Sequence, residues 1–138
     1  MNGHQLSDAF YGANIRDENF DSVDLNSLSL NRLWLDRCTF VGTDLRHATL
    51  DGCHFKLCDF RNANFRGASV RHATFSGCDL RDADLRDTDL TGASFGSVNT
   101  GTEAGRTNLT DACLDGATLR DAQFENVVGP HPLLGRRS

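Results

Sequence analysis

Large apolar residues recur at every fifth position along most of the chain, and the positions between them are small or polar. A period of five fits neither the 3.6-residue repeat of an amphipathic helix nor the alternation of a strand. The pattern therefore indicates an internal repeat, which decides the architecture before any single element is assigned. Between Thr43 and Phe95 the period has no slip, with its apolar members at Leu45, Leu50, Phe55, Phe60, Phe65, Val70, Phe75, Leu80, Leu85, Leu90 and Phe95.

The same register divides the chain into three parts. It extends back to Phe10, fails in a Gly/Thr-rich stretch after Phe95, and resumes at Leu109. We therefore expect a repeat region over 10–126 with a loop insertion at about 96–106. Residues 1–9 are predicted to form an N-terminal cap, and 127–138 a proline-containing tail that covers the open end of the stack.

Composition excludes several classes of protein. The 138 residues suffice for one domain, and the net charge of −5 argues against direct binding to nucleic acid or to an anionic membrane surface. The N-terminus lacks a basic segment followed by an apolar stretch, so no secretory signal is predicted. Five cysteines without such a signal favour a reducing compartment, and we expect a cytoplasmic protein.

The repeat resembles that of the pentapeptide-repeat family, written A-(D/N)-L-x-x. Ala63-Asn64-Phe65, Ala83-Asp84-Leu85 and Cys58-Asp59-Phe60 match it directly. The resemblance implies an all-β fold, a right-handed quadrilateral β-helix in which four repeats make one coil. About five to six coils are expected from the length of the repeat region. The large residue and the small residue two places before it would point inward.

Stacked coils turn the sequence into columns, because residues twenty apart would lie one above another. Phe55, Phe75 and Phe95 form one such column, and Phe124 joins it if the loop replaces a corner. An α-helix anywhere between residues 43 and 95 would contradict this register.

The reactive side chains do not form a recognisable site. Cys38, Cys58 and Cys78 fall in one inward column, but a straight column cannot surround a tetrahedral metal ion. We interpret them as small buried residues in place of alanine. No two histidines lie twenty residues apart, so they do not stack. We therefore predict no catalytic residues, no metal site and no cofactor.

Charge is uneven along the chain. Residues 76–125 contain ten acidic and four basic residues, a net charge of −6 that exceeds the −5 of the whole chain. Trp34 is predicted to be exposed beneath His54, and arginines form one outward column. The candidate partner-binding residues are Asp79, Asp82, Asp84, Asp87, Asp89, Asp111, Asp115, Asp121, Trp34, Arg46, Arg66 and Arg86.

The resemblance and the charge together suggest a non-catalytic, bacterial protein-interaction solenoid. The family includes Qnr-like and MfpA-like members, which mimic duplex DNA, bind type II topoisomerases such as DNA gyrase or topoisomerase IV, and give quinolone resistance. A similar role here is one hypothesis. The alternative is a general scaffold that binds an unrelated protein through Trp34, the 96–106 loop or the arginine column. An enzyme or ligand carrier is disfavoured, and the chain is expected to be a monomer or an end-to-end homodimer.

Overall fold

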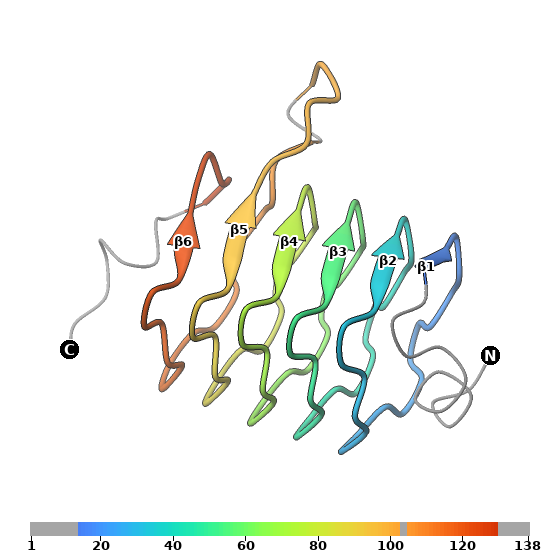
Figure 1. Cartoon of the computed structure of the whole chain (residues 1–138), viewed down its shortest axis with the longest axis vertical. Coiled ribbons are helices and arrows are strands. Elements are labelled where there is room, and N and C mark those ends of the chain that lie inside the picture. Colours follow the sequence, from blue (N-terminus) through green and yellow to red (C-terminus); the bar gives the residue numbers. More distant parts are fainter. Residues whose placement is uncertain (1–13, 103–104, 130–138) are drawn as a thin grey trace.

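The protein is a stack of short parallel strands. The structure is a computed structural model that describes residues 14–102 and 105–129. The strands form one parallel sheet in chain order (Figure 1), and each pairs with the strand twenty residues earlier until the last step. The strands are β1 (Asn14–Arg16), β2 (Trp34–Asp36), β3 (His54–Lys56), β4 (Thr74–Ser76), β5 (Ser94–Gly96) and β6 (Gln123–Phe124).

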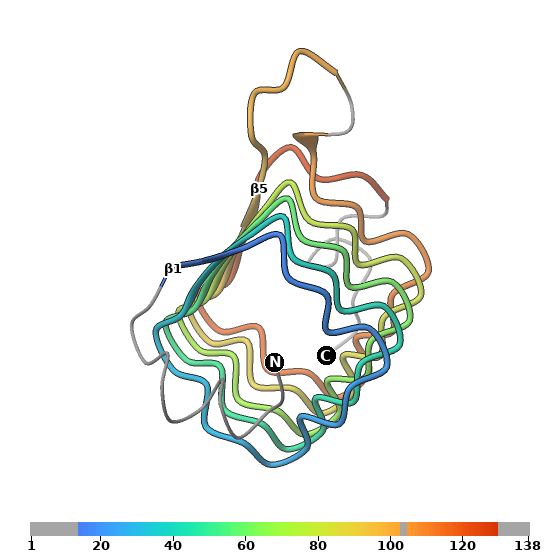
Figure 2. The same cartoon turned by 90° about the vertical axis from the view of Figure 1, so that its right-hand side faces the viewer.

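Three further rows of paired residues complete a four-sided coil, which Figure 2 shows end-on as a roughly square outline. We call the strand-bearing face side 1 and number the others in chain order. Side 2 carries Asn19, Thr39, Asp59, Asp79 and Asn108; side 3 carries Asp24, Asp44, Asn64, Asp84 and Cys113; side 4 carries Ser29, Thr49, Ser69, Asp89 and Thr118.

The predicted fold class is confirmed, and residues 43–95 contain no α-helix. The number of coils is lower than the five to six expected. Four regular turns of twenty residues connect β1 to β5, and the step from β5 to β6 is enlarged. The predicted cap lies entirely outside the described residues, as does the part of the predicted tail beyond residue 129.

The repeat sequence fits the turn at each corner. The Asp or Asn before the large apolar residue accepts a hydrogen bond from the backbone N–H two residues later, as in Asp44 Oδ1 from Arg46 N (3.0 Å) and Asn64 Oδ1 from Arg66 N (3.0 Å). This Asx arrangement satisfies a turn donor that no neighbouring strand reaches. The last residue of a repeat has a left-handed backbone conformation, as at His47 (φ 60°). The ring of His47 lies where a side chain on Gly67 would be. Glycine at 67 therefore leaves room for the histidine of the preceding coil.

The inward slot two places before each large residue holds small side chains. Ala63, Cys58 and Thr88 are at most 2% exposed. A hydroxyl or thiol in this slot donates to the carbonyl of the coil below, as from Thr88 Oγ1 to Phe65 O (2.9 Å) and from Cys58 Sγ to Leu35 O (3.3 Å). The slot therefore accepts Thr and Cys as well as Ala, because their polar atoms find a backbone acceptor.

An aromatic column fills side 1 of the core. Phe55 stacks on Phe75 at 4.9 Å between ring centroids, Phe75 on Phe95 at 4.9 Å, and Phe95 on Phe124 at 4.8 Å. The predicted place of Phe124 in this column is confirmed, since Phe95 and Phe124 are paired. The interval there is 29 residues rather than 20, so nine extra residues are accommodated without loss of the stack.

The extra residues form a hairpin that projects from the coil after β5 (Figure 2). Ser97 pairs antiparallel with Arg106, and Val98 N donates to Gly105 O (2.7 Å). Arg106 also donates to two carbonyls of the last coil, Asn126 O (3.0 Å) and Val127 O (2.6 Å). The base of the hairpin is therefore bonded to the solenoid, which the glycine-rich sequence did not indicate.

Replacing Phe75 by alanine should lower the free energy of unfolding by about 3–5 kcal/mol, because the ring is fully buried between Phe55 and Phe95 and its loss leaves a cavity. Denaturant unfolding measures the change. Thr74→Ser, on the outer surface of the same strand, is the control. An unchanged unfolding midpoint for Phe75→Ala would mean that residue 75 does not point inward.

Shortening the hairpin should leave the solenoid folded, whereas removing Arg106, which anchors the hairpin to the last coil, should lower the free energy of unfolding. Deletion of residues 99–104 is expected to preserve the β circular dichroism spectrum.

Arg106→Ala is expected to lower the free energy of unfolding by about 1–2 kcal/mol, because two charge-assisted hydrogen bonds are lost. Arg120→Ala is a matched control in the last coil. Equal effects of the two arginine variants would contradict an anchoring role for Arg106.

Candidate protein-binding surfaces

The interior of the described solenoid contains apolar side chains and satisfied thiols. Cys38, Cys58 and Cys78 are at most 2% exposed, and burial raises the pKa of Cys53 to about 12. A hydrogen bond with Cys58, together with burial, raises the pKa of Cys38 far above its ordinary value. The thiols of Cys38 and Cys53 therefore stay protonated at neutral pH, which makes them poor nucleophiles and poor metal ligands. The described residues contain no group of three side chains suited to hold a metal ion.

Aspartate and arginine two residues apart form closed pairs on the outer surface. Arg46 Nη2 lies 2.9 Å from Asp44 Oδ2, and Arg86 Nη2 lies 2.7 Å from Asp84 Oδ2. The hydrogen bond from Arg46 lowers the pKa of Asp44 to about 2. Arginines of the predicted column therefore neutralise carboxylates of their own repeats, and Asp84 contributes less free charge than its sequence position suggests.

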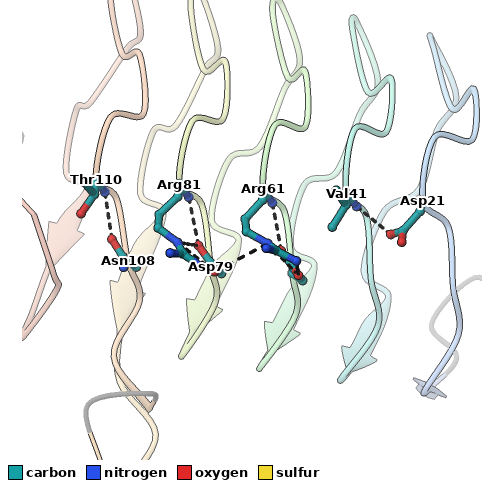
Figure 3. Close-up of polar contacts among 8 residues, drawn as sticks. Asp21, Val41, Arg61, Asp79, Arg81, Asn108 and Thr110 are labelled. Carbon is teal, nitrogen blue, oxygen red and sulfur yellow. Dashed lines mark hydrogen bonds and ion pairs between the residues drawn. The ribbon is translucent and has the colours of Figure 1, made fainter.

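Side 2 carries a ladder of such pairs, drawn in Figure 3. Arg81 contacts Asp79 at 2.7 Å within one coil, and Arg61 Nε lies 3.9 Å from Asp79 Oδ2 in the next. Asp59 is paired with Arg61 at 2.8 Å. The two middle coils of this side are thus internally neutralised. Asp79, predicted as a partner contact, is already held by two arginines.

Side 3 and its two corners differ, because charge accumulates towards the C-terminal end. The five successive segments 22–27, 42–47, 62–67, 82–87 and 111–116 stack on one another, with net charges of −1, 0, +1, −2 and −2. The last two contain five aspartates and only Arg86 as a base. We call these aspartates the acidic patch: Asp82, Asp84, Asp87, Asp111 and Asp115.

The backbone positions of the acidic patch hold its carboxylates outside the coil. Asp82, Asp87 and Asp111 occupy left-handed corner positions with φ of 59°, 56° and 61°. Asp87 lies over Gly116, and Arg66 of the preceding coil approaches it at 3.6 Å. Asp82, Asp111 and Asp115 have no ion pair among the described residues. The patch is therefore unevenly neutralised, with most free charge at these three carboxylates.

The remaining predicted contacts lie elsewhere. Asp89 belongs to side 4, where its carboxylate accepts hydrogen bonds from Thr91 N and Thr91 Oγ1 at 3.0 and 2.6 Å. Asp121 is at the corner between sides 4 and 1, with φ 58°. The eight predicted aspartates are thus spread over three sides rather than gathered on one.

Trp34 forms a separate surface on side 1. Its side chain is 53% exposed and stacks on His54 with ring centroids 3.9 Å apart, which confirms the predicted position of His54 above it. A groove of about 200 Å³ runs beside the pair and is bordered by Val98 of the hairpin. The sequence did not indicate that the hairpin reaches this face, since Val98 is 64 residues from Trp34.

Comparison with known proteins places the chain in a family. The family described as "Pentapeptide repeat region" matches residues 30–104, more than half of the chain. The chain belongs to the pentapeptide-repeat family. Proteins of this family are generally structural or interaction solenoids rather than enzymes.

Several solved pentapeptide-repeat structures are similar to this chain. Trypsin-treated QnrB1, a plasmid-mediated fluoroquinolone resistance protein, is 21% identical over 86% of this chain and 65% of that one, with a TM-score of 0.47. A thylakoid-lumen protein of Arabidopsis thaliana is 20% identical over 88% and 72%, with a TM-score of 0.45. Rfr23 of the cyanobacterium Cyanothece 51142 is 20% identical over 89% and 97%, with a TM-score of 0.43.

This pentapeptide-repeat chain spans less than two thirds of the QnrB1 chain, and the likenesses assign no partner to it. A search of curated proteins found no match. In the described part of the chain, no helix has the length and apolar character needed to cross a bilayer.

The pairs on side 3 predict a specific response to acid. The folded-state pKa of Asp44 is about 2, below its ordinary value of 3.8, so its contribution to stability is present above about pH 4 and is lost as the pH falls through 2. Arg46→Gln should return the pKa of Asp44 towards 3.8, which carboxyl-detected NMR measures. Arg66→Gln, from the same column, should leave the pKa of Asp44 unchanged. Equal shifts of the Asp44 pKa in both variants would mean that the arginines act on Asp44 only through long-range electrostatics and not through the paired hydrogen bond.

Proposed function

We propose that this pentapeptide-repeat protein is a non-catalytic binding module whose acidic patch occupies a basic, DNA-binding groove of a protein partner. A type II topoisomerase, DNA gyrase or topoisomerase IV, is the first candidate. The observation that carries the proposal is the charge gradient along side 3. Its first three segments sum to zero, and its last two sum to −4.

The density of this charge supports the proposal. Two stacked coils span about 10 Å of axis, so a net charge of −4 gives about one charge per 2.5 Å. Duplex DNA carries about one per 1.7 Å. The patch therefore approaches duplex density over a short length, whereas the N-terminal three coils of the same side do not.

The rigidity of the patch also favours recognition. Its carboxylates are attached to a backbone that is hydrogen-bonded to both neighbouring coils. Asp84 N donates to Ala63 O (2.9 Å) and Asp84 O accepts from Phe65 N (2.7 Å), both in the preceding coil, while Leu85 N donates to Cys113 O (2.8 Å) in the next coil. Fixed charges lose little conformational freedom on binding. A flexible acidic tail of equal charge would lose more.

The choice of topoisomerase as first candidate rests on the resemblance to Qnr-like and MfpA-like members. Occupation of the DNA-binding groove would exclude DNA and lower the rate of supercoiling.

The Trp34 surface supports a second candidate, a scaffold that binds an unrelated protein through side 1. Its exposed ring pair and bordering hairpin have the apolar character of an interface anchor.

A supercoiling assay with purified gyrase tests the proposal. Inhibition at micromolar protein should weaken as salt rises, because exposed charges are screened. The fourfold variant Asp82→Asn, Asp87→Asn, Asp111→Asn and Asp115→Asn should reduce inhibition at least tenfold. Asparagine tolerates the left-handed corner positions, so the backbone should be retained.

The matched control removes four charges from the N-terminal coils: Asp17→Asn, Asp21→Asn, Asp24→Asn and Asp36→Asn. It changes the net charge equally and should leave inhibition within about twofold of the wild type. Equal loss in both variants would show a dependence on net charge rather than on the patch. No inhibition of gyrase or topoisomerase IV by the wild type would contradict the topoisomerase assignment, and a response of Trp34 fluorescence to another protein would favour the scaffold.

A further inference from the structure

A basic groove lies at the corner between sides 4 and 1, in the N-terminal half of the solenoid and away from the acidic patch. It has a volume of about 480 Å³ and is lined by Asn31, Arg32, Asp51, Gly52, Arg71 and His72. This volume lies within the range of small-molecule sites.

The corner glycine creates the groove. Arg32, Gly52 and His72 are stacked at one corner in successive coils, with left-handed φ of 61°, 69° and 58°. Side chains at this position point along the stack, and Arg32 Cγ lies 3.4 Å from where a Cβ of Gly52 would be. Because residue 52 has no side chain, a gap remains beside Arg32, whereas the His72 ring is directed towards Gly92 of the following coil.

The one carboxylate in the groove is already satisfied. Asp51 accepts from Ser69 Oγ (2.7 Å), from Arg71 N (2.9 Å) and from Arg71 Nη2 (3.2 Å). Burial alone raises the pKa of Asp51, but these hydrogen bonds outweigh it and hold the pKa below its ordinary value. The carboxylate therefore stays ionised and serves to position Arg71.

The other lining groups are donors. Arg32 has no carboxylate partner among the described residues, in contrast to Arg46, Arg61, Arg81 and Arg86. Arg71 uses one nitrogen for Asp51 and retains further N–H donors. Asn31 accepts from Asp51 N through Oδ1 (3.2 Å), which leaves its amide nitrogen as a donor.

We propose that this groove binds a small phosphate-bearing anion, with Arg32 and Arg71 as its principal ligands and Asn31 as an additional donor. Guanidinium groups match phosphate oxygens in geometry as well as charge. Arg32 and Arg71 come from coils on either side of Gly52, so the oxygens of one phosphate can be contacted from two directions. The volume exceeds that of inorganic phosphate and leaves room for an attached organic group.

Titration of the ¹⁵N-labelled protein with inorganic phosphate and with pyrophosphate, at ionic strength held constant with sodium chloride, tests the proposal. Saturable shifts should be confined to the amides of residues 31–32, 51–52 and 71–72. Arg32→Gln should weaken binding at least fivefold. Gly52→Asn, which fills the gap while tolerating positive φ, should weaken it similarly.

Arg61→Gln is the control, since Arg61 is an exposed arginine on side 2. Its affinity for phosphate should match that of the wild type. Shifts spread over all the arginine-bearing sides, or equal weakening by Arg32→Gln and Arg61→Gln, would overturn the proposal by showing general attraction of anions. Absence of saturable shifts up to 50 mM of either probe, on the order of the weakest useful affinity, would overturn it as well.

Discussion

The stacking of each side chain on its equivalent in the preceding coil is the constraint on which the rest of this structure depends. Large inward residues of the middle coils lie between apolar residues of the two neighbouring coils, and the column of Phe55, Phe75, Phe95 and Phe124 shows the rule most clearly. A solenoid of this kind has only nearest-neighbour contacts along its axis. A mismatch in one coil therefore affects the coils on either side of it and little else.

The same constraint explains how the hairpin is tolerated. Nine extra residues leave the coil at a corner, and Thr107 re-enters the inward slot above Cys78, accepting a hydrogen bond from Cys78 N (3.1 Å) and donating one to Phe75 O (3.1 Å). The column continues as though the interval were still twenty. Insertion at a corner costs little because a corner contributes no strand pairing to the stack.

The fold could be predicted from the sequence because every fifth residue is large and apolar and is therefore buried. Leu45 or Phe65 must be buried, and the period then determines every other column. The alignment of the repeats after the hairpin with those before it could also be predicted, because it is the alignment that stacks Phe124 on Phe95. The number of regular coils was overestimated: four steps of twenty residues connect β1 to β5, and the step to β6 contains the hairpin.

The surface was less predictable, because a residue's column does not tell which way its side chain turns. Asp79 and Asp84 were predicted as partner contacts, but arginines two residues later fold back onto them. The position of Val98 at the border of the groove beside Trp34 depends on the path of the hairpin, which the glycine-rich sequence leaves open. The groove at Gly52 was missed because it arises from a missing side chain beside Arg32.

These features give the sides of the solenoid different chemical character. Paired charges on side 2 offer little net attraction to a partner. Unpaired aspartates at the C-terminal end of side 3, a donor-rich groove at the corner between sides 4 and 1, and the ring pair on side 1 are spatially separate. Each can therefore be altered without disturbing the column that holds the coils together.

Contacts between aromatic rings in solution test the stacking register most directly. With selectively labelled phenylalanine, the ring of Phe95 should show nuclear Overhauser effects to Phe75 and to Phe124, both within 5 Å between centroids. The contact between Phe95 and Phe124 should be present although 29 residues separate the two rings in the sequence. Contacts from Phe95 to Leu114 in place of Phe124 would contradict the account, because they would mean that the coil after the hairpin stacks in a different register.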